Sequence, residues 1–218
     1  MIGRKTASLA CLLAVLGAGA SPGALAAGDP AAGQQKAAAC MACHGQDGNS
    51  LADMWPKLAG QVPDYIVKQL QDFKAGRRSD EQMSPQAANL SEQDMADIAA
   101  YFAGQKPSAA ESDKTLLARG EQLYLKGKGR PQPVTACTGC HGPAGAGNRD
   151  WKKLMAQAPA VLAPAIGGQH PAYVAKQLKA YRDGSRGNDA ARVMRDIARG
   201  LGDMEIAALA AHVARLGR

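Results

Sequence analysis

The chain has few aromatic residues and no segment with the alternating apolar and polar pattern of a β-strand. Phe, Trp and Tyr together make up 4% of its 218 residues. Because large aromatic side chains normally supply much of a core's apolar surface, these side chains alone would build only a lean core. The apolar run at 7–20 is shorter than the roughly 20 residues of a membrane-spanning helix. These absences predict an all-α protein whose core is completed by an added apolar group.

Cysteine is also scarce outside one repeated motif. Four of the five cysteines form two copies of Cys-x-x-Cys-His, at Cys40, Cys43 and His44 and again at Cys137, Cys140 and His141. This spacing is typical of covalent c-type haem attachment, because both thiols reach the vinyl groups of one haem and the imidazole follows to bind its iron. A zinc ribbon needs its cysteine pairs roughly 15–20 residues apart, and a thioredoxin-like redox pair also fits poorly. The sequence therefore predicts two covalently attached c-type haems.

The fifth cysteine lies in an N-terminal segment that resembles a secretory signal. Arg4 and Lys5 precede the apolar run, and the small residues of Ala24-Leu25-Ala26 follow it. We expect residues 1–26 to be a cleaved signal peptide that takes Cys11 with it. Export suits c-type haem, which is attached outside the cytoplasm.

The remaining residues contain an internal repeat, which predicts two domains. Gly-Gln-x-Pro-x-Tyr occurs at 60–65 and again at 168–173, in step with the two haem motifs. We expect an N-terminal domain at 27–104, a linker at 105–113 and a C-terminal domain at 114–218. The larger offset after the second haem motif places an insertion between His141 and Gly168.

Helical patterns recur in both halves. A short helix is expected over 31–39, before the first haem motif. Pro63 begins a second helix that Gly76 ends at its C-cap. Ser91 can cap a third helix together with Asp94, three residues on.

The second axial ligand of each iron is expected to be methionine. Only Met83 and Met194 occupy equivalent positions in the two copies, each in an irregular stretch a few residues before the last helix. The alternative is that both are adaptable core fillers. Pro56 and Pro164 precede the two Gly-Gln pairs by four residues, and their carbonyls are candidates to accept from the iron-binding histidines.

Two histidines lie outside the haem motifs. His212 occupies the position of Tyr101 on the last helix, which indicates a packing or hydrogen-bonding role. His170 lies in a loop before Pro171, where it would replace methionine only if the second haem departs from the repeat.

These residues make the chain similar to the dihaem cytochrome c4 family, a duplicated form of class I c-type cytochrome. The matching features are the two haem motifs, the repeated Gly-Gln-x-Pro-x-Tyr and the segments that begin at Met83 and Met194. The resemblance implies two tandem cytochrome c domains, each with one covalently bound haem, related by a pseudo-two-fold axis with haem edges facing across the interface. It also implies a periplasmic electron carrier, not an enzyme. The loop at 149–164 is longer than the simplest family pattern, so we expect the rim of the second haem to differ from that pattern in shape.

The expected partners are redox proteins of the respiratory chain. The candidates are a haem-copper oxidase, as the terminal oxidase toward which electrons would pass, and a quinol-oxidising complex. Two alternatives stay open. The chain could be the cytochrome subunit of a flavocytochrome c sulfide dehydrogenase, which would purify with a flavin-bearing partner. It could also be a dihaem enzyme such as a peroxidase or a thiosulfate-oxidising cytochrome, which needs an exchangeable haem position.

Charge is distributed unevenly between the two copies. Residues 27–107 hold 7 basic and 10 acidic side chains, a net charge of −3, whereas residues 108–218 hold 17 and 9, a net charge of +8. Such polarity orients a protein as it approaches a charged partner. We expect the basic domain to dock on an acidic partner or, as a peripheral protein, on an anionic membrane surface. The candidate contacts are Arg186, Arg192, Arg195 and Arg199. We expect a monomer, and no nucleic acid as partner.

Overall fold

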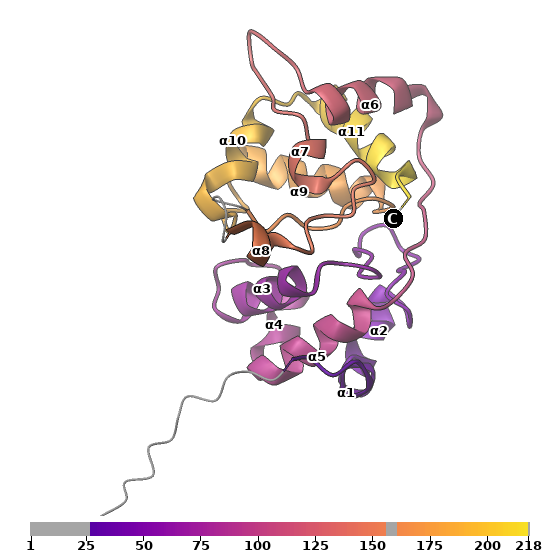
Figure 1. Cartoon of the computed structure of the whole chain (residues 1–218), viewed down its shortest axis with the longest axis vertical. Helices are drawn as coiled ribbons and strands as arrows, with labels where there is room; N and C mark the ends of the chain where they lie inside the picture. Colours follow the sequence, from indigo (N-terminus) through magenta and orange to yellow (C-terminus); the bar gives the residue numbers. More distant parts are fainter. Residues whose placement is uncertain (1–26, 156–160, 218) are drawn as a thin grey trace, which may run out of the picture.

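The computed structural model describes residues 27–155 and 161–217, so the predicted signal peptide and Cys11 lie outside the described residues. Two helical domains stack on each other, the N-terminal one in the lower half of Figure 1 and the C-terminal one in the upper half. The described residues contain no β-strand beyond one isolated bridge between Lys128 and Val134. None of their helices is long and apolar enough to cross a membrane. The all-α prediction is confirmed.

Each domain repeats the same series of helices. The N-terminal domain holds α1 (Pro30–Lys36), α2 (Ala38–His44), α3 (Pro63–Lys74), α4 (Met83–Ala88) and α5 (Glu92–Ala103). Their counterparts are α6 (Leu117–Lys126), α7 (Thr138–His141), α9 (Pro171–Asp183), α10 (Val193–Arg199) and α11 (Asp203–Arg215). The C-terminal domain adds the short elements η1 (Lys114–Leu116), α8 (Trp151–Met155) and η2 (Ala190–Arg192).

Most local signals in the sequence act as predicted. Pro63 begins α3, and Gly76 follows its C-cap residue with a φ of +70°. Ser91 and Asp94 form a complete capping box at the start of α5. The helix expected over 31–39 is wrong in extent, because α1 ends at Lys36 and a separate helix, α2, contains the whole first haem motif.

The first and last helices of each domain cross at a glycine. A methyl group on Gly33 of α1 would lie 2.0 Å from the carbonyl oxygen of Asp97 on α5. A methyl group on Gly120 of α6 would lie 2.1 Å from the carbonyl oxygen of Ala208 on α11. Only a residue without a side chain lets the two backbones approach this closely. In both domains, therefore, a glycine allows the first helix to pack directly against the last.

Each domain has its own hydrophobic core. The core of the N-terminal domain contains Ile66, Leu70, Phe73, Met95, Ile98 and Phe102, among others. That of the C-terminal domain contains Leu123, Tyr124, Val134, Leu201, Ile206, Leu209 and Val213. Because no core residue is shared between these two clusters, each half of the chain packs around its own haem motif.

The linker touches both domains. The ammonium of Lys57 donates to the carbonyls of Ser108 and Ala109, at 3.1 and 2.9 Å. The next residue, Ala110, is buried, and its N–H donates to the carbonyl of Ala214. The segment expected as the linker is therefore anchored to both domains near its centre.

The insertion after the second haem motif reaches the N-terminal domain. Asp64 of α3 accepts from the indole of Trp151 at 2.9 Å and from the ammonium of Lys152 at 2.8 Å. Arg149 also donates to the carbonyl of Gly60. The described start of the insertion, in and beside α8, thus binds the two domains together.

Candidate haem sites and the domain interface

The first haem motif lies on α2. Cys40 and Cys43 are three positions apart in a helix and so share one face. His44 is the last residue of α2 and is only 4% exposed. Its Nδ1 lies 2.8 Å from the carbonyl oxygen of Pro56. Gly45, with a φ of +81°, then turns the chain away from the helix, as few other residues could.

The second motif has the same construction on α7. Cys137 is the N-cap residue and Cys140 lies three positions on. His141 ends the helix, is 7% exposed, and places its Nδ1 2.9 Å from the carbonyl oxygen of Pro164. The two proline carbonyls therefore accept from the two motif histidines, which confirms that prediction.

These contacts define the state of both imidazoles. A carbonyl oxygen can only accept, so the proton of His44 and of His141 lies on Nδ1, and Nε2 carries the lone pair that can bind iron. Burial lowers the pKa of both histidines, while the proline carbonyls act in the opposite direction. Both rings are thus neutral at physiological pH, which is the form a metal ligand requires.

The four cysteines are unpaired, as thioether formation requires. Burial raises the pKa of the Cys40 thiol and raises that of Cys137 to about 11. Across the described residues, no three His, Cys, Asp or Glu side chains converge on a point where they could hold a metal ion directly. The donor set consists of paired thiols and one neutral imidazole per motif, which fits a haem bound through its ring and its iron.

The two candidate methionines lie on short helices. Met83 is the first residue of α4 and Met194 the second residue of α10, so the prediction of irregular stretches is wrong. Met83 packs against the same core cluster as Cys40. Before Met194 the backbone is strained, because Ala191 and Arg192 have φ values of 49° and 61°. Helices of six and seven residues are too short to show a clear apolar period, so the sequence pattern did not predict α4 and α10.

Two tyrosines fix the turns that follow the haem motifs. Tyr101 of α5 donates to the carbonyl of Gln46 at 2.7 Å. Tyr124 of α6 donates to the carbonyl of Gly142, and burial raises the pKa of Tyr124 well above its usual value. The sequence repeat did not reveal this shared role, because the two hydroxyls come from helices that are not equivalent.

The domain interface uses equivalent residues of both copies. Arg186 donates to the hydroxyl of Tyr65 at 2.8 Å, and Arg78 donates to the hydroxyl of Tyr173 at 3.2 Å. The same arginines also donate across the interface to Gln69 and Gln177 respectively. Tyr65 and Tyr173, like Arg78 and Arg186, are 108 positions apart. This reciprocity is what a pseudo-two-fold axis produces, as in a symmetric dimer.

Comparison with known proteins agrees with this arrangement. The Cytochrome c family model matches the chain twice, over residues 30–106 and 117–217. Cytochrome c4 of Pseudomonas aeruginosa is 49% identical over 189 residues, which cover 86% of this chain and 89% of that protein. The chain belongs to the cytochrome c4 family. It is a dihaem electron-transfer cytochrome with two covalently bound c-type haems.

A solved member of the cytochrome c4 family shares the whole fold. The reduced recombinant cytochrome c4 from Pseudomonas stutzeri has a TM-score of 0.79 and 46% identity, covering 87% of this chain and 100% of that one. A protein named thiosulfate dehydrogenase electron acceptor, from Stutzerimonas stutzeri, is 37% identical over 186 residues, 84% of this chain and 81% of that protein.

One of the arginines expected to dock on a partner is not at the surface of this cytochrome. Arg186 is 7% exposed and stacks 4.5 Å from the ring centre of Tyr181 while it bonds across the interface, so that prediction is wrong. Arg195 is mostly buried and bonds to Asp189 at 2.6 Å. Arg192 and Arg199 remain exposed. A count of charges along the sequence does not distinguish an outer surface from an interface between domains.

The two remaining histidines have structural roles. His170 is buried at the domain interface, where its Nε2 lies 3.0 Å from the hydroxyl and 2.9 Å from the carbonyl of Ser50. It is therefore engaged with the other domain and not free to replace a methionine. His212 packs its ring against Tyr124, with 5.3 Å between ring centres, in line with the predicted packing role.

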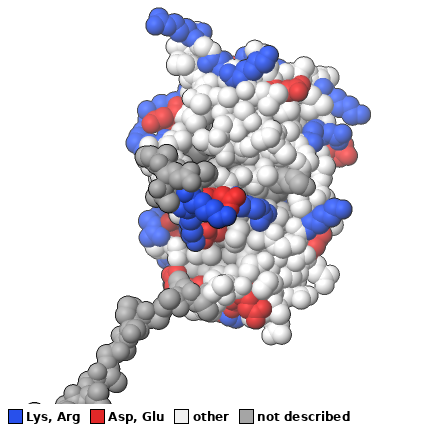
Figure 2. All heavy atoms as spheres, in the orientation of Figure 1, with Lys and Arg blue, Asp and Glu red and all other residues white. Residues whose placement is uncertain are grey.

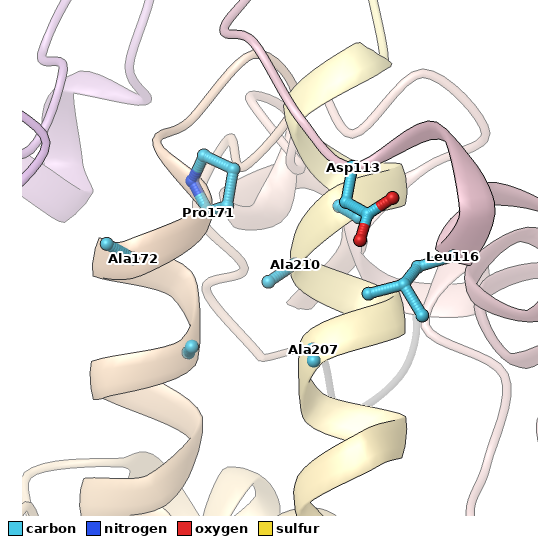
Figure 3. Close-up of a pocket in the computed structure, with 8 residues that line it drawn as sticks. Asp113, Leu116, Pro171, Ala172, Ala207 and Ala210 are labelled. Carbon is cyan, nitrogen blue, oxygen red and sulfur yellow. The ribbon is translucent and has the colours of Figure 1, made fainter.

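A shallow apolar pocket lies away from both haem motifs. Figure 3 shows it between α9 and α11, with Asp113 and Leu116 at one side. Its volume is about 260 Å³ and alanine side chains make up most of its lining. It contains no cysteine, histidine or methionine, so it is not part of the haem sites.

Proposed function

We propose that each domain holds its haem with the residues that the repeated motifs supply. Cys40 and Cys43 attach one haem and Cys137 and Cys140 the other; His44 and Met83 bind the first iron, and His141 and Met194 bind the second. The observation that carries this proposal is the pair of buried histidines whose Nδ1–H groups donate to Pro56 and Pro164. The same geometry occurs in both domains at residues matched by the sequence repeat.

The chain's own side chains suit electron transfer better than catalysis. A c-type haem supplies a centre that accepts and releases one electron. A neutral imidazole and a soft thioether as axial ligands raise the reduction potential of such a centre. Two protein ligands also leave no position for oxygen or peroxide, which speaks against a peroxidase.

The proposed place of this carrier is the periplasm, between a quinol-oxidising complex and a terminal oxidase of the haem-copper type. Two features support export: the apolar segment near the N-terminus, and the attachment of c-type haem outside the cytoplasm. The difference between −3 and +8 in net charge supports docking of the C-terminal domain on an acidic surface. In Figure 2, lysines and arginines lie around the edge of the upper, C-terminal half, and a group of both signs lies near the middle of the molecule. The exposed Arg192 and Arg199 are the remaining candidate contacts.

The ligand assignment is tested by opening one iron at a time. Met83→Ala and Met194→Ala should each allow the reduced protein to bind one carbon monoxide per chain, whereas the wild type binds none. Optical titration with carbon monoxide measures this, with haem counted by the pyridine haemochrome method. The matched controls are Met54→Ala and Met204→Ala, which remove an exposed methionine from each domain. Stoichiometric binding of carbon monoxide by the wild type would instead indicate an open haem and an enzyme of the peroxidase type.

A second candidate function concerns the electron donor. The relative named as a thiosulfate dehydrogenase electron acceptor favours a role in which this cytochrome accepts electrons from such an enzyme. Stopped-flow reduction by thiosulfate dehydrogenase with thiosulfate, compared with reduction by a quinol-oxidising complex, separates the two. Saturable reduction by only one of these donors identifies the pathway. Purification of the native protein with a tightly bound flavoprotein would instead favour the sulfide dehydrogenase alternative.

A further inference from the structure

Two buried glutamines cross the domain interface in the same way. Gln169 donates from Nε2 to the carbonyl of Lys57 at 3.0 Å and accepts at Oε1 from the N–H of Lys57 at 2.8 Å. Gln61 forms the same pair of bonds with Ala165, at 2.8 and 2.7 Å. Gln61 is 6% exposed and Gln169 is 5% exposed. Each side-chain amide therefore holds one residue of the opposite domain through two hydrogen bonds, with water excluded.

The residue that each glutamine holds follows the proline that orients a haem-motif histidine. The peptide unit between Pro56 and Lys57 accepts from His44 through its oxygen and donates to Gln169 through its nitrogen. The unit between Pro164 and Ala165 accepts from His141 and donates to Gln61. Each histidine is thus linked through one peptide group to a glutamine of the other domain.

Hydrogen bonds at the two ends of a peptide group reinforce each other. When the N–H donates to a glutamine oxygen, the carbonyl oxygen at the other end becomes a stronger acceptor. A stronger bond to the imidazole Nδ1–H makes the ring a more basic ligand. A more basic ligand favours ferric iron and so lowers the reduction potential.

We propose that Gln61 and Gln169 are positioning residues that set the donor strength of the iron-binding histidine in the opposite domain. This inference rests on the proposed binding of His44 and His141 to iron. Each half of the molecule then tunes the redox centre of the other half through the intact interface. Each reduction potential then depends on one glutamine of the opposite domain.

If the glutamines acted only within their own domains, substituting them would change a different haem from the one that the proposal predicts. Gln61 Oε1 also accepts from the N–H of Val62, and Gln169 Oε1 from the N–H of His170. If these local bonds were what mattered, removing a glutamine would disturb its own domain. If the glutamines only held the domains together, both haems would change alike. The crossed effect on a single haem distinguishes the proposal from both.

The test uses the holoprotein variants Gln169→Met and Gln61→Met. Redox titration followed by NMR of the haem methyl signals reports each haem separately. Gln169→Met should raise the ratio of reduced to oxidised first-domain haem about threefold at a fixed potential, equivalent to about 28 mV for one electron. The second-domain haem should not move, and the Nδ1–H resonance of His44 should shift upfield. Gln61→Met should give the mirror image, with His141 affected.

A neighbouring glutamine provides the matched control. Gln177 also takes part in the interface: its Oε1 accepts from Arg78 of the N-terminal domain and from Arg186 of its own domain. Neither of these bonds involves the peptide group after Pro56 or the one after Pro164. Gln177→Met should leave the Nδ1–H resonances of both histidines in place. Gln169→Glu places a carboxylate, a stronger acceptor than an amide oxygen, against the N–H of Lys57 and should shift the His44 Nδ1–H resonance downfield, opposite to the methionine variant. This opposite shift serves as the test if the methionine variant does not fold, and no shift of the His44 resonance would overturn the proposal.

Three outcomes overturn the proposal: equal shifts of both haems, a shift in the glutamine's own domain, or no shift at all. Failure of the proposed iron ligation is seen separately in the wild type. If the ring protons of His44 and His141 in the ferrous protein lacked the large shifts of an axial ligand, the premise itself would be wrong. With those shifts present and the crossed effect absent, only the role of Gln61 and Gln169 is refuted.

Discussion

Replacing Gly33 by alanine should separate the first and last helices of the N-terminal domain. The added methyl group would lie 2.0 Å from the carbonyl oxygen and 2.5 Å from the carbonyl carbon of Asp97. Both are backbone atoms, so no flexible side chain can move aside and α1 must shift away from α5. This shift disturbs the haem motif as well, because α2 follows α1 directly.

The magnitude follows from two opposing effects. Overpacking typically costs about 1–3 kcal/mol, and a clash between backbones belongs at the upper end of that range. Alanine regains about 1 kcal/mol because it favours the helical backbone more than glycine does. The expected net loss for Gly33→Ala is therefore about 2 kcal/mol in the free energy of unfolding. Gly120→Ala should give a similar loss in the C-terminal domain.

Urea unfolding of the oxidised holoprotein, followed by helical circular dichroism, measures this loss. The matched control is Gly104→Ala at the C-cap of α5, where the nearest atom would be 3.5 Å from the new methyl group. The free energy of unfolding of this control should lie within about 0.5 kcal/mol of the wild-type value. If Gly33→Ala unfolded at the same urea concentration as this control, close backbone approach would not be what holds α1 on α5.

Three further predictions concern the interface, acid stability and docking. Arg186→Met should lower the free energy of unfolding by about 2–4 kcal/mol, because charged hydrogen bonds contribute about 1.5–3 kcal/mol each; urea unfolding should show little change for the exposed control Arg192→Met. Bonds from Lys36, the Asp29 N–H and Gln93 hold the pKa of Asp97 at about 2. That carboxylate therefore stabilises the fold above about pH 4 and loses its effect as the pH falls toward 2. Acid titration by circular dichroism should show this transition shifted or lost in Asp97→Asn. Arg199→Glu should slow association with an acidic oxidase most at low ionic strength, and a rate equal to wild type in stopped-flow would refute docking through this face.

Local chemistry was predictable where neighbouring residues carry it. The haem motifs, the capping box at Ser91 and the proline start of α3 depend on residues within a few positions of each other. The contact between His44 and Pro56 could also be predicted, because the repeat placed a proline at the same distance from each Gly-Gln pair.

Long-range contacts were not predictable from the same signals. Arg186 looked like one of many basic surface residues until the fold placed it against Tyr65, 121 positions away in the chain. The glutamines at 61 and 169 were visible as part of a repeated motif, but their partners lie in the opposite domain. A sequence repeat does not indicate whether its repeated polar residues contact their own domain or the opposite one.

The sequence by itself determined that this protein has two equivalent halves, each with paired thiols, a following histidine and a matched methionine. These features depend on the spacing of residues along the chain and on hydrogen bonds between near neighbours. A helix of that sequence forms such bonds without help from the rest of the fold. Only the tertiary structure decided how the halves meet. Packing α3 and α9 against each other's loops buries Arg186 and two glutamines and partly buries Arg78. It also connects each haem-motif histidine to the opposite domain through a single peptide group. Such contacts depend on the relative position of two folded bodies, which local sequence does not encode.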